Sequence, residues 1–434
     1  MREMKDSGVA WIDNIPKDWA IIPLKMVAEY RKGLSITKAD LSETGIPVVS
    51  YGQIHSKLNS GTHLSDNLIR FVSPSYLSSN PSSIGKYGDL LFADTSEDYE
   101  GIGNAVYLDT SECVFAGYHT IIVRPTIDME RKYLAYLCRS DCWRSQLRAR
   151  AFGIKVYSVT QTMLKSVSIL LPPTSEQQKI VSILDLKCCQ INDLIANGEA
   201  QIEKLKQYKQ SVIAEVVTKG LDPTVPMKDS GVAWIGDIPA HWEVKRGKAL
   251  FQETEARSID GSEELLTVSQ YTGITPRSQK NVNMFEALTL EGYKICEIGD
   301  IAANTMWLWA GAIGVSKYRG VISPSYNVYR QKSSEYVPEY LDILLSAPML
   351  VQEYASLSTG IRASRLRCYP KDFLNIRFPV PPLKEQEKIL CFFAKKFAAV
   401  DRLISIKQDK IEKLEQYKRS LIYEYVTGKK EVTV

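Results

Sequence analysis

The sequence has no long apolar run and little net charge. None of its apolar stretches approaches the roughly 18 residues of a membrane-spanning helix, and the first ten residues, MREMKDSGVA, contain no apolar signal core. The formal net charge is only +4, so a surface that binds nucleic acid would have to gather its positive charge locally. We therefore expect a cytoplasmic protein with no membrane contact, and the hydrophobic fraction of 44% is ample for packed cores.

Metal-binding patterns are also missing. The chain has eight cysteines and four histidines, and although Cys138 and Cys142 could share a helical face, it contains no Cys-x-x-Cys pair. We expect no metal on this chain, and free thiols in a reducing compartment.

The sequence motifs of P-loop enzymes, adenine methyltransferases and nucleases are absent as well. A P-loop needs a Gly-rich turn that ends in Gly-Lys-Ser/Thr, and the Gly-Lys pairs at 85–86 and 247–248 lack both the upstream glycine and the hydroxyl residue. An adenine methyltransferase needs an Asn/Asp-Pro-Pro-aromatic loop, and residues 80–83 (NPSS) lack the second proline and the aromatic residue. The acidic cluster at 94–98 has no matching lysine motif of a nuclease, so it fits a solvated or DNA-reading loop better. We expect no catalytic residue, no enzyme activity and no cofactor on this chain.

The chain instead contains its own pattern twice. Three phrases recur: MKDSGVAWIDNIPKDW (4–19) as MKDSGVAWIGDIPAHW (227–242), PPTSEQQKI from Pro172 as PPLKEQEKI from Pro381, and IEKLKQYK from Ile202 as IEKLEQYK from Ile411. Twelve of the sixteen positions in the first phrase are identical. A period this long indicates a duplicated domain pair, 4–226 and 227–434, rather than a solenoid. The two bodies, 23–171 and 245–378, match only at scattered points.

Each copy ends in a long amphipathic segment. Apolar residues recur at steps of three and four: Ile180, Leu184, Ile191, Leu194, Ile202, Leu205, Tyr208, Val212 and Val216, and then Ile389, Phe393, Val400, Leu403, Ile411, Leu414, Tyr417, Leu421 and Tyr425. The spacing predicts helices over 175–219 and 384–427, each about 60 Å long at 1.5 Å per residue. The repeated stripes favour antiparallel pairing of the two helices as a coiled coil. The alternative is that each stripe packs on its own body.

The two bodies are predicted to be mixed α/β with strands dominant. Strands are expected at 47–51, 88–93, 104–108 and 120–124, and at 265–268, 299–303, 312–318 and 326–330, with one helix in each body at 131–148 and 337–354. We therefore predict an α+β fold in which two mixed α/β bodies are joined by two long antiparallel coiled-coil helices in a pseudo-twofold internal duplication.

One loop differs between the two bodies on a shared scaffold. Five residues match at one constant offset: Gly88, Asp89, Ile102, Gly103 and Tyr107 with Gly299, Asp300, Ile313, Gly314 and Tyr318. Between these anchors, DTSEDYEG (94–101) faces TMWLWAGA (305–312). A loop whose sequence differs while the flanking strands are retained is typical of binding specificity. Neutral sequence divergence in an exposed loop would give the same pattern. The two tryptophans favour contact with a ligand.

These repeated phrases and divergent bodies resemble the specificity subunit of type I restriction-modification systems. The resemblance rests on the Pro-Pro-x-x-Glu-Gln phrases, the IEKLKQYK and IEKLEQYK seams and the WI…IP…W head, and it covers essentially the whole chain. It implies target recognition domains at 1–171 and 223–378, and conserved spacer helices at 172–222 and 379–434. It also implies double-stranded DNA with a bipartite asymmetric site as the ligand.

The resemblance further implies which partners carry the chemistry. Two methyltransferase subunits would bind S-adenosylmethionine and methylate adenine, and restriction subunits would use ATP and Mg. Two readings from other classes remain open, a coiled-coil scaffold that binds only proteins and a stand-alone methyltransferase fused to its reader.

Polar and aromatic residues in turns, and basic segments before each Pro-Pro, are the predicted DNA-binding residues. In the first body they are Tyr51, Gln53, His55, Ser96, Glu97, Asp98, Tyr99, Tyr118, His119, Lys155 and Tyr157. In the second they are Gln270, Tyr271, Asn304, Trp307, Trp309, Ser325, Tyr326, Asn327, Arg362, Ser364, Arg365 and Arg367. Arginine suits guanine edges and lysine suits phosphates. The alternatives are a solvated strand edge for the basic segments and a purely structural role for a buried Tyr or Asn.

Overall fold

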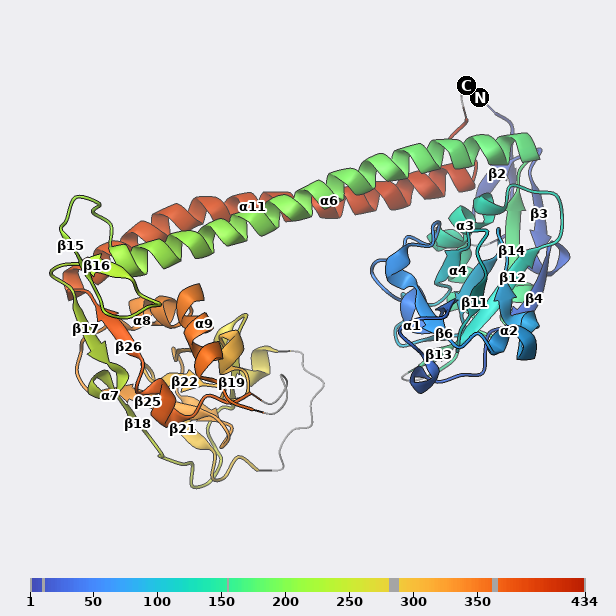
Figure 1. The fold of residues 1–434 in the computed structure, drawn as a ribbon. Coiled ribbons are helices and arrows are strands. Elements are labelled where there is room, and N and C mark those ends of the chain that lie inside the picture. Colours follow the sequence, from blue (N-terminus) through green and yellow to red (C-terminus); the bar gives the residue numbers. More distant parts are fainter. Residues whose placement is uncertain (1, 10–11, 154–155, 281–288, 361–365, 433–434) are drawn as a thin grey trace. The chain divides into compact units, whose positions relative to one another are not determined.

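The computed structural model of the chain describes residues 2–9, 12–153, 156–280, 289–360 and 366–432. The chain forms two compact units (Figure 1). Unit 1 comprises Met1–Gly198 and Asp409–Val434, and unit 2 comprises Glu199–Gln408. Each unit therefore holds one head, one body, the first part of one long helix and the last part of the other.

Unit 1 is built mainly from short strands. They are β1 (Met4–Asp6), β2 (Asn14–Pro16), β3 (Ala20–Pro23), β4 (Ala28–Lys32), β5 (Ile46–Val49), β6 (Arg70–Val72), β7 (Ile84–Gly85), β8 (Leu90–Ala93), β9 (Thr95–Ser96), β10 (Ala105–Tyr107), β11 (Val114–Ala116), β12 (Thr120–Pro125), β13 (Tyr157–Ser158) and β14 (Ser168–Leu171). Its body helices are α1 (Tyr51–Ile54), α2 (Tyr76–Ser79), α3 (Arg131–Arg139), α4 (Asp141–Arg148) and α5 (Gln161–Ser166). Two four-stranded sheets, ordered β10-β8-β12-β4 and β6-β5-β11-β7, form the centre of the body.

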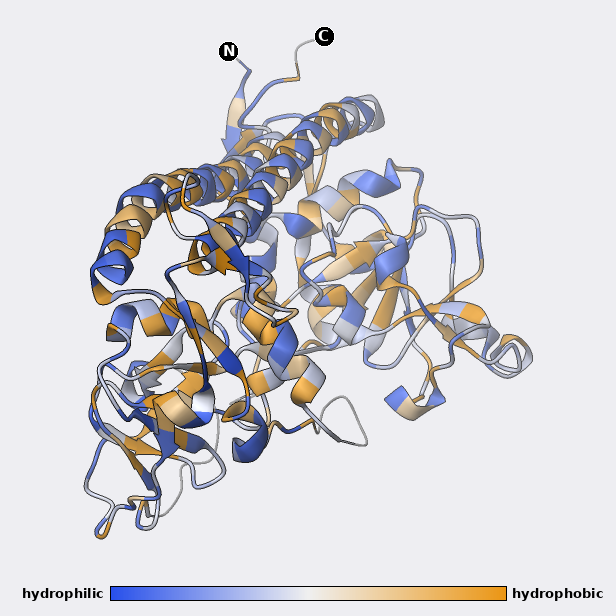
Figure 2. Ribbon diagram, turned by 60° about the vertical axis from the view of Figure 1, so that its left-hand side comes forward, coloured by the Kyte–Doolittle hydropathy of each residue, from blue (hydrophilic) through white to orange (hydrophobic). Residues whose placement is uncertain are grey.

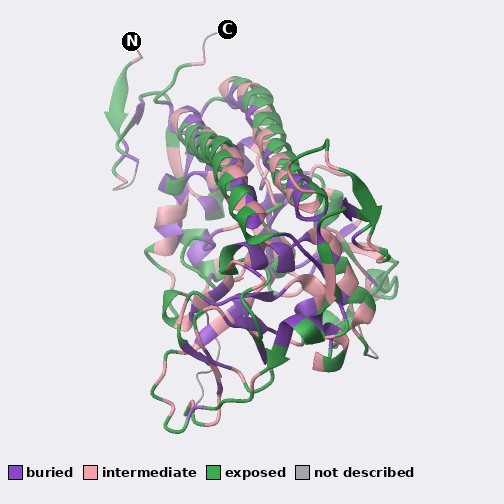
Figure 3. Ribbon diagram, turned by 90° about the vertical axis from the view of Figure 1, so that its left-hand side faces the viewer, coloured by how far each residue is buried: buried purple, intermediate pink, exposed green. Residues whose placement is uncertain are grey.

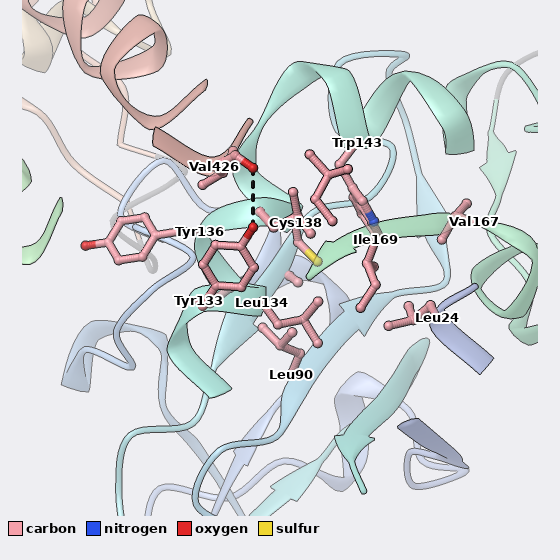
Figure 4. Close-up of a cluster of buried hydrophobic side chains, with 14 of the residues drawn as sticks. Leu24, Leu90, Tyr133, Leu134, Tyr136, Cys138, Trp143, Val167, Ile169 and Val426 are labelled. Atoms are coloured by element: carbon pink, nitrogen blue, oxygen red, sulfur yellow. Dashed lines mark hydrogen bonds between the residues drawn. The ribbon is translucent and has the colours of Figure 1, made fainter. Parts of the chain in front are cut away.

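The β8 strand is buried on both faces because its residues alternate between two cores. Leu90 and Phe92 join the core beneath α3 and α4, whereas Leu91 and Ala93 join a second core. Figure 4 shows the first core, in which Trp143 is fully buried and the Tyr133 hydroxyl donates to the Val426 carbonyl at 3.3 Å. The end of α11 is thus part of the core of unit 1.

The single helix predicted at 131–148 is wrong, since the structure has two helices there. Ser140 adopts an extended backbone (φ −73°, ψ 141°) between α3 and α4, and its hydroxyl donates to the Leu137 carbonyl. The helix predicted at 337–354 is divided in the same way, because Ala347 is extended and Pro348 can only begin a new helix.

Within its described residues, unit 2 repeats this plan with fewer strands. Its strands are β15 (Met227–Asp229), β16 (Asp237–Pro239), β17 (Glu243–Arg246), β18 (Phe251–Glu253), β19 (Leu266–Ser269), β20 (Gly273–Pro276), β21 (Lys294–Cys296), β22 (Ile301–Ala303), β23 (Ile313–Val315), β24 (Gly320–Ile322), β25 (Asn327–Gln331) and β26 (Arg377–Val380). Its body helices are α7 (Gly247–Leu250), α8 (Pro338–Leu345), α9 (Pro348–Leu357) and α10 (Pro370–Phe373). The four-stranded sheet is ordered β18-β25-β22-β23.

The strand register corrects part of the predicted alignment between the bodies. Asp89 and Asp300 are equivalent, since each carboxylate binds an arginine of the neighbouring strand, Arg124 or Arg330, at 2.7 Å. The next strand is shifted, however. Ala105 lies opposite Phe92 in unit 1, and Ile313 lies opposite Ala303 in unit 2.

Ile313 is therefore the equivalent of Ala105, and Val315 is the equivalent of Tyr107. The equal spacing of Gly103 and Gly314 in the sequence is a coincidence, because the unit 1 loop is longer by three residues. The rewritten loop thus changes in length as well as in sequence.

The two long helices, α6 (Thr174–Lys219) and α11 (Leu383–Val426), pair antiparallel in each unit. In unit 1, Lys418 donates to Asn192 at 2.6 Å, and Gly198 lets Ile411 approach so closely that an added Cβ would lie 3.1 Å from its side chain. In unit 2, Lys407 contacts Gln201 and Lys209 pairs with Asp401 at 2.7 Å. The residue numbers run in opposite directions in both pairs, as predicted.

Part of the predicted apolar seam is wrong. Leu194, Tyr208, Leu403 and Tyr417 are 44–52% exposed. A helix of 3.6 residues per turn drifts away from a 3.5-residue repeat, so only part of a long stripe stays in the interface. The two predicted arrangements of the apolar stripe both occur. Part of the stripe pairs the two helices, whereas Ile180 and Leu184 pack into the body core of unit 1. Figure 2 shows apolar and polar residues alternating along both helices, and Figure 3 shows exposed residues along them.

The repeated Trp and Glu-Gln residues bind each helix start to its own body. The indole N–H of Trp19 donates to Glu176 at 3.0 Å, and that of Trp242 donates to Glu385 at the same distance. Gln386, fully buried, accepts from the Val337 N–H at 2.9 Å and donates to the carbonyls of Pro381 and Glu335 at 2.8 Å. Gln177 accepts from Glu130 and donates to Pro172 in the same way. The repeated phrases are therefore structural.

Two further observations bear on the predicted absences. None of the helices in the described residues is long and apolar enough to cross a membrane. All eight cysteines are free thiols.

Candidate nucleic-acid interface

In unit 1, four of the predicted residues form one aromatic cluster. The ring of Tyr51 lies 5.6 Å from Tyr118, 5.5 Å from His119 and 6.2 Å from His55, edge to face in each case. Tyr51 begins α1 and His55 follows its last residue, whereas Tyr118 and His119 lie in the turn before β12, far away in the sequence. The fold thus brings together residues that were predicted separately.

Both histidines of this cluster are held by polar neighbours. His55 Nε2 lies 2.7 Å from the Thr95 carbonyl, and its Nδ1 lies 3.0 Å from the Asn104 amide. His119 has a left-handed backbone (φ 54°), and its Nδ1 lies 3.1 Å from Asp94. Such a conformation costs free energy in a non-glycine residue and is frequent at functional sites. Asn104 was not predicted to support this cluster, because nothing in its local sequence indicates a contact with His55.

A pocket of about 660 Å³ opens beside this cluster. Its lining includes Lys32, Asp94, Tyr118, His119 and Gln161. The donors and acceptors in it can bind base edges, and Lys32 can bind a phosphate. Lys32 and Gln161 were not predicted, because nothing in their local sequence distinguishes them from other surface residues.

The rewritten loop of unit 1 lies against the segment after α4. β9 pairs with β13 so that Tyr157 lies opposite Ser96, and the Tyr99 and Tyr157 rings are 6.0 Å apart. Tyr99 is 50% exposed, and Glu97 and Asp98 are also exposed. Exposed carboxylates can accept from cytosine amino groups, and one oxygen of Asp98 already accepts from the Gly101 N–H. Lys155 lies outside the described residues.

Two predicted residues of unit 1 have structural roles instead. Ser96 is buried and donates its hydroxyl to the Asp98 carbonyl at 2.7 Å. The Gln53 side chain accepts from the Ser50 N–H at 3.2 Å, which caps α1.

In unit 2, the rewritten loop presents two stacked tryptophans. The rings of Trp307 and Trp309 are 5.6 Å apart, and the Trp309 N–H donates to the Met306 carbonyl at 2.9 Å. Trp307 is 48% exposed, which is unusual for so large an apolar side chain. In the β19–β20 turn, Gln270 is exposed and Tyr271 is 86% exposed. Exposed aromatic rings can stack on bases that are not paired.

Hydrogen bonds between polar residues of unit 2 support this loop. The buried Asn304 donates to the Tyr326 hydroxyl at 2.9 Å, and Thr305 donates to the Ser325 carbonyl at 2.6 Å. Asn327 is also buried, in β25. Because Asn304 and Asn327 are buried, the predicted alternative of a purely structural role applies to them, whereas Ser325 is exposed.

Only part of the basic segment in unit 2 is described. Arg367 is exposed. Its backbone N–H donates to the Thr359 carbonyl at 2.9 Å, and its carbonyl accepts from the Thr359 N–H at 3.0 Å. Arg362, Ser364 and Arg365 lie outside the described residues. Within the described ranges, no group of three or more His, Cys, Asp or Glu side chains is arranged to hold a metal ion.

Comparison with known proteins gives a consistent family. Residues 16–204 match the family described as the type I restriction modification DNA specificity domain. The chain is 27% identical to a candidate type I restriction enzyme specificity subunit, MjaX, of Methanocaldococcus jannaschii, over 96% of this chain and 95% of that protein. It is 25% identical to the MjaVIII specificity subunit of the same organism, over 73% of this chain and 76% of that protein.

The fold is also similar to a solved structure. The chain superposes with a TM-score of 0.64 and 18% identity on a chain from a type I R-M system, solved to explain complex assembly and conformational transition. The match covers 95% of this chain and 99% of that chain. At this identity the likeness concerns the fold.

Proposed function

We propose that the chain is a specificity subunit of a type I restriction-modification system and selects the DNA sequence on which such a complex acts, because residues 16–204 match the DNA specificity domain and nearly the whole chain is similar to such a subunit. The observation that carries this proposal is the pair of divergent bodies on a repeated frame. Two different readers on one scaffold suit a bipartite, asymmetric site, as dimer geometry sets half-site spacing in other DNA-binding proteins.

The proposal divides the chain into readers and spacers. Residues 1–171 and 223–378 are the target recognition domains, and residues 172–222 and 379–434 are the spacer helices. In the first domain, Tyr51, His55, Tyr118 and His119 contact one half of the site, beside the pocket of about 660 Å³. In the second, Tyr271 and Trp307 contact the other half, since both rings are exposed on described loops.

Catalysis lies on partner subunits, and the chain itself is a non-catalytic recognition subunit. We propose that two methyltransferase subunits supply S-adenosylmethionine and methylate adenine, and that restriction subunits supply ATP and Mg chemistry. The complex acts in the cytoplasm, where its DNA lies.

Exposed apolar residues on the long helices support the binding of two identical partners. Leu194 and Tyr417 in unit 1 are 50% and 52% exposed, and Leu403 and Tyr208 in unit 2 are 48% and 44% exposed. Leu194 matches Leu403 in the repeat, and Tyr208 matches Tyr417. Each unit therefore presents the same pair of residue types, which suits one methyltransferase on each unit.

DNA binding by the chain assembled with its methyltransferase tests the proposal. Affinity for duplexes with either half of the site scrambled is measured by fluorescence anisotropy across a salt series. His119→Ala should weaken binding by about 1–3 kcal/mol, and only for duplexes that retain the half read by unit 1. His63→Ala is the matched control, because His63 pairs with Asp109 outside the cluster.

The same titration tests the first alternative, and an assay of methyl transfer from S-adenosylmethionine by the purified chain tests the second. A protein-only scaffold would give no salt-dependent binding of any duplex. A stand-alone methyltransferase would transfer methyl groups without the partner subunit.

A further inference from the structure

Unit 2 contains a pocket of about 270 Å³ on the side of its sheet that α8 covers. Ile298 and Gly299 form one wall, Val315 another, and Pro338 and Asp342 of α8 the third. Ile298 is 70% exposed at the rim, and Asp342 accepts from the Val315 N–H at 2.8 Å. None of its lining residues belongs to the loop 305–312 that carries Trp307 and Trp309.

The first copy of the domain fills the equivalent place with its own side chains. Val337 and Glu130 are equivalent, since each donates its N–H to the buried glutamine of the Glu-Gln phrase. Arg131 therefore corresponds to Pro338. Its Cδ lies 2.3 Å from where a Cβ on Gly88 would stand, and its guanidinium donates to the Tyr87 carbonyl at 2.9 Å.

Two further replacements open the pocket and change its charge. Tyr107, which is 2% exposed and whose ring lies 6.4 Å from that of Tyr87, corresponds to Val315. Ala135 corresponds to Asp342. Unit 2 has thus lost an arginine and an aromatic ring at this place and has gained a carboxylate.

The charges on the lining favour a cation. Asp342 and Glu339 are acidic, and Lys317 is the single basic residue of the lining. The formal charge of the lining is therefore −1. Burial raises the pKa of the Asp342 carboxyl, and Glu339 raises it further, whereas Val315 and Lys317 lower it. A cation beside Asp342 would stabilise the carboxylate. A DNA phosphate would be repelled, whereas the guanidinium group of a protein arginine carries the complementary charge.

We infer that this pocket binds the guanidinium group of an arginine from a protein partner, in the place that Arg131 occupies in unit 1. The arginine would donate to the carboxylate of Asp342 and to the carbonyl of Ile298, which is equivalent to the acceptor of Arg131. Its aliphatic stem would pack on Val315 and Pro338. The inference does not depend on DNA reading.

Methyl NMR of the full chain, titrated with n-propylguanidinium, tests this site. The Ile298 and Val315 methyl groups line the pocket, so their resonances should shift saturably. Neutral n-propylurea has nearly the same shape and should bind at least about tenfold more weakly, which corresponds to about 1.4 kcal/mol. Equal affinities, or no shift of these two residues, would overturn the inference.

Two variants separate charge from shape. Asp342→Asn keeps an oxygen for the Val315 N–H but removes the charge, so guanidinium should bind no better than urea. The double variant Val315→Tyr/Pro338→Arg restores the unit 1 side chains and should abolish binding of both probes. Unchanged methyl resonances elsewhere show that each variant is folded. Tighter binding of guanidinium than of urea to Asp342→Asn, or binding of guanidinium to the double variant, would contradict the assignment.

Discussion

Replacement of Gln386 by alanine should destabilise unit 2 selectively. The Gln386 side chain is fully buried and makes three hydrogen bonds, to Val337, Pro381 and Glu335. Each bond contributes about 1 kcal/mol net, and a buried group left unpaired costs about 1–3 kcal/mol. Because one N–H and two carbonyls lose their partner, we expect a loss of about 3–5 kcal/mol. Gln177→Ala breaks two such bonds in unit 1 and should cost less.

Hydrogen exchange followed by mass spectrometry measures this loss unit by unit. A loss of about 3–5 kcal/mol should accelerate amide exchange in α8 of Gln386→Ala by roughly 10²- to 10⁴-fold, with α3 of unit 1 unchanged. The exposed neighbour Glu387→Ala is the control and should change stability by less than about 0.5 kcal/mol. A loss below about 1 kcal/mol in α8, or equal acceleration in α3, would refute the structural role of the Glu-Gln phrase.

Three further predictions concern the spacer, the bodies and the thiols. Insertion of four helical residues before Ile202 should lengthen the helix by about 6 Å and widen the unread gap of the DNA site by one or two base pairs, which methylation mapping detects. Exchange of residues 23–171 for the body of a relative should change one half of the methylated site, and changes in both halves would contradict independent readers. At pH 8, iodoacetamide should label the exposed Cys189 and Cys391 first. Cys296 should react much later than these two, since burial raises its pKa to about 12 and so leaves little thiolate at that pH, and early labelling of Cys296 in peptide maps would contradict its burial.

The sequence predicts the frame of this fold well, because the frame depends on periodic and repeated residues. The stripe of residues such as Ile180 and Ile389 predicts both long helices and their antiparallel pairing. The helix breaks at Ser140 and Ala347 were missed, since a change in backbone direction at one residue does not disturb the apolar spacing. The exposed Leu194 was assigned to the helix–helix seam because its spacing fits the repeat locally. The gradual rotation of the apolar stripe around the helix becomes apparent only over many turns.

The candidate DNA site could be predicted only in part. Tyr51, Tyr118 and His119 were chosen for their residue types, and their contacts depend on how separate loops meet on the sheets. The register of β23 could not be deduced, because the loop before it differs in length between the bodies while a chance Ile-Gly match suggests equal length. The pocket beside Asp342 likewise becomes visible only when the two bodies are compared residue by residue.

Methylome sequencing of a host that carries this gene with its methyltransferase partner tests the central claim most directly. We predict adenine methylation at one bipartite, asymmetric site with two short specified halves and an unread gap of fixed length. The methylation should be lost when the gene for this chain is deleted and the methyltransferase is kept. Methylation at a single contiguous sequence, or a pattern unchanged by the deletion, would contradict the account.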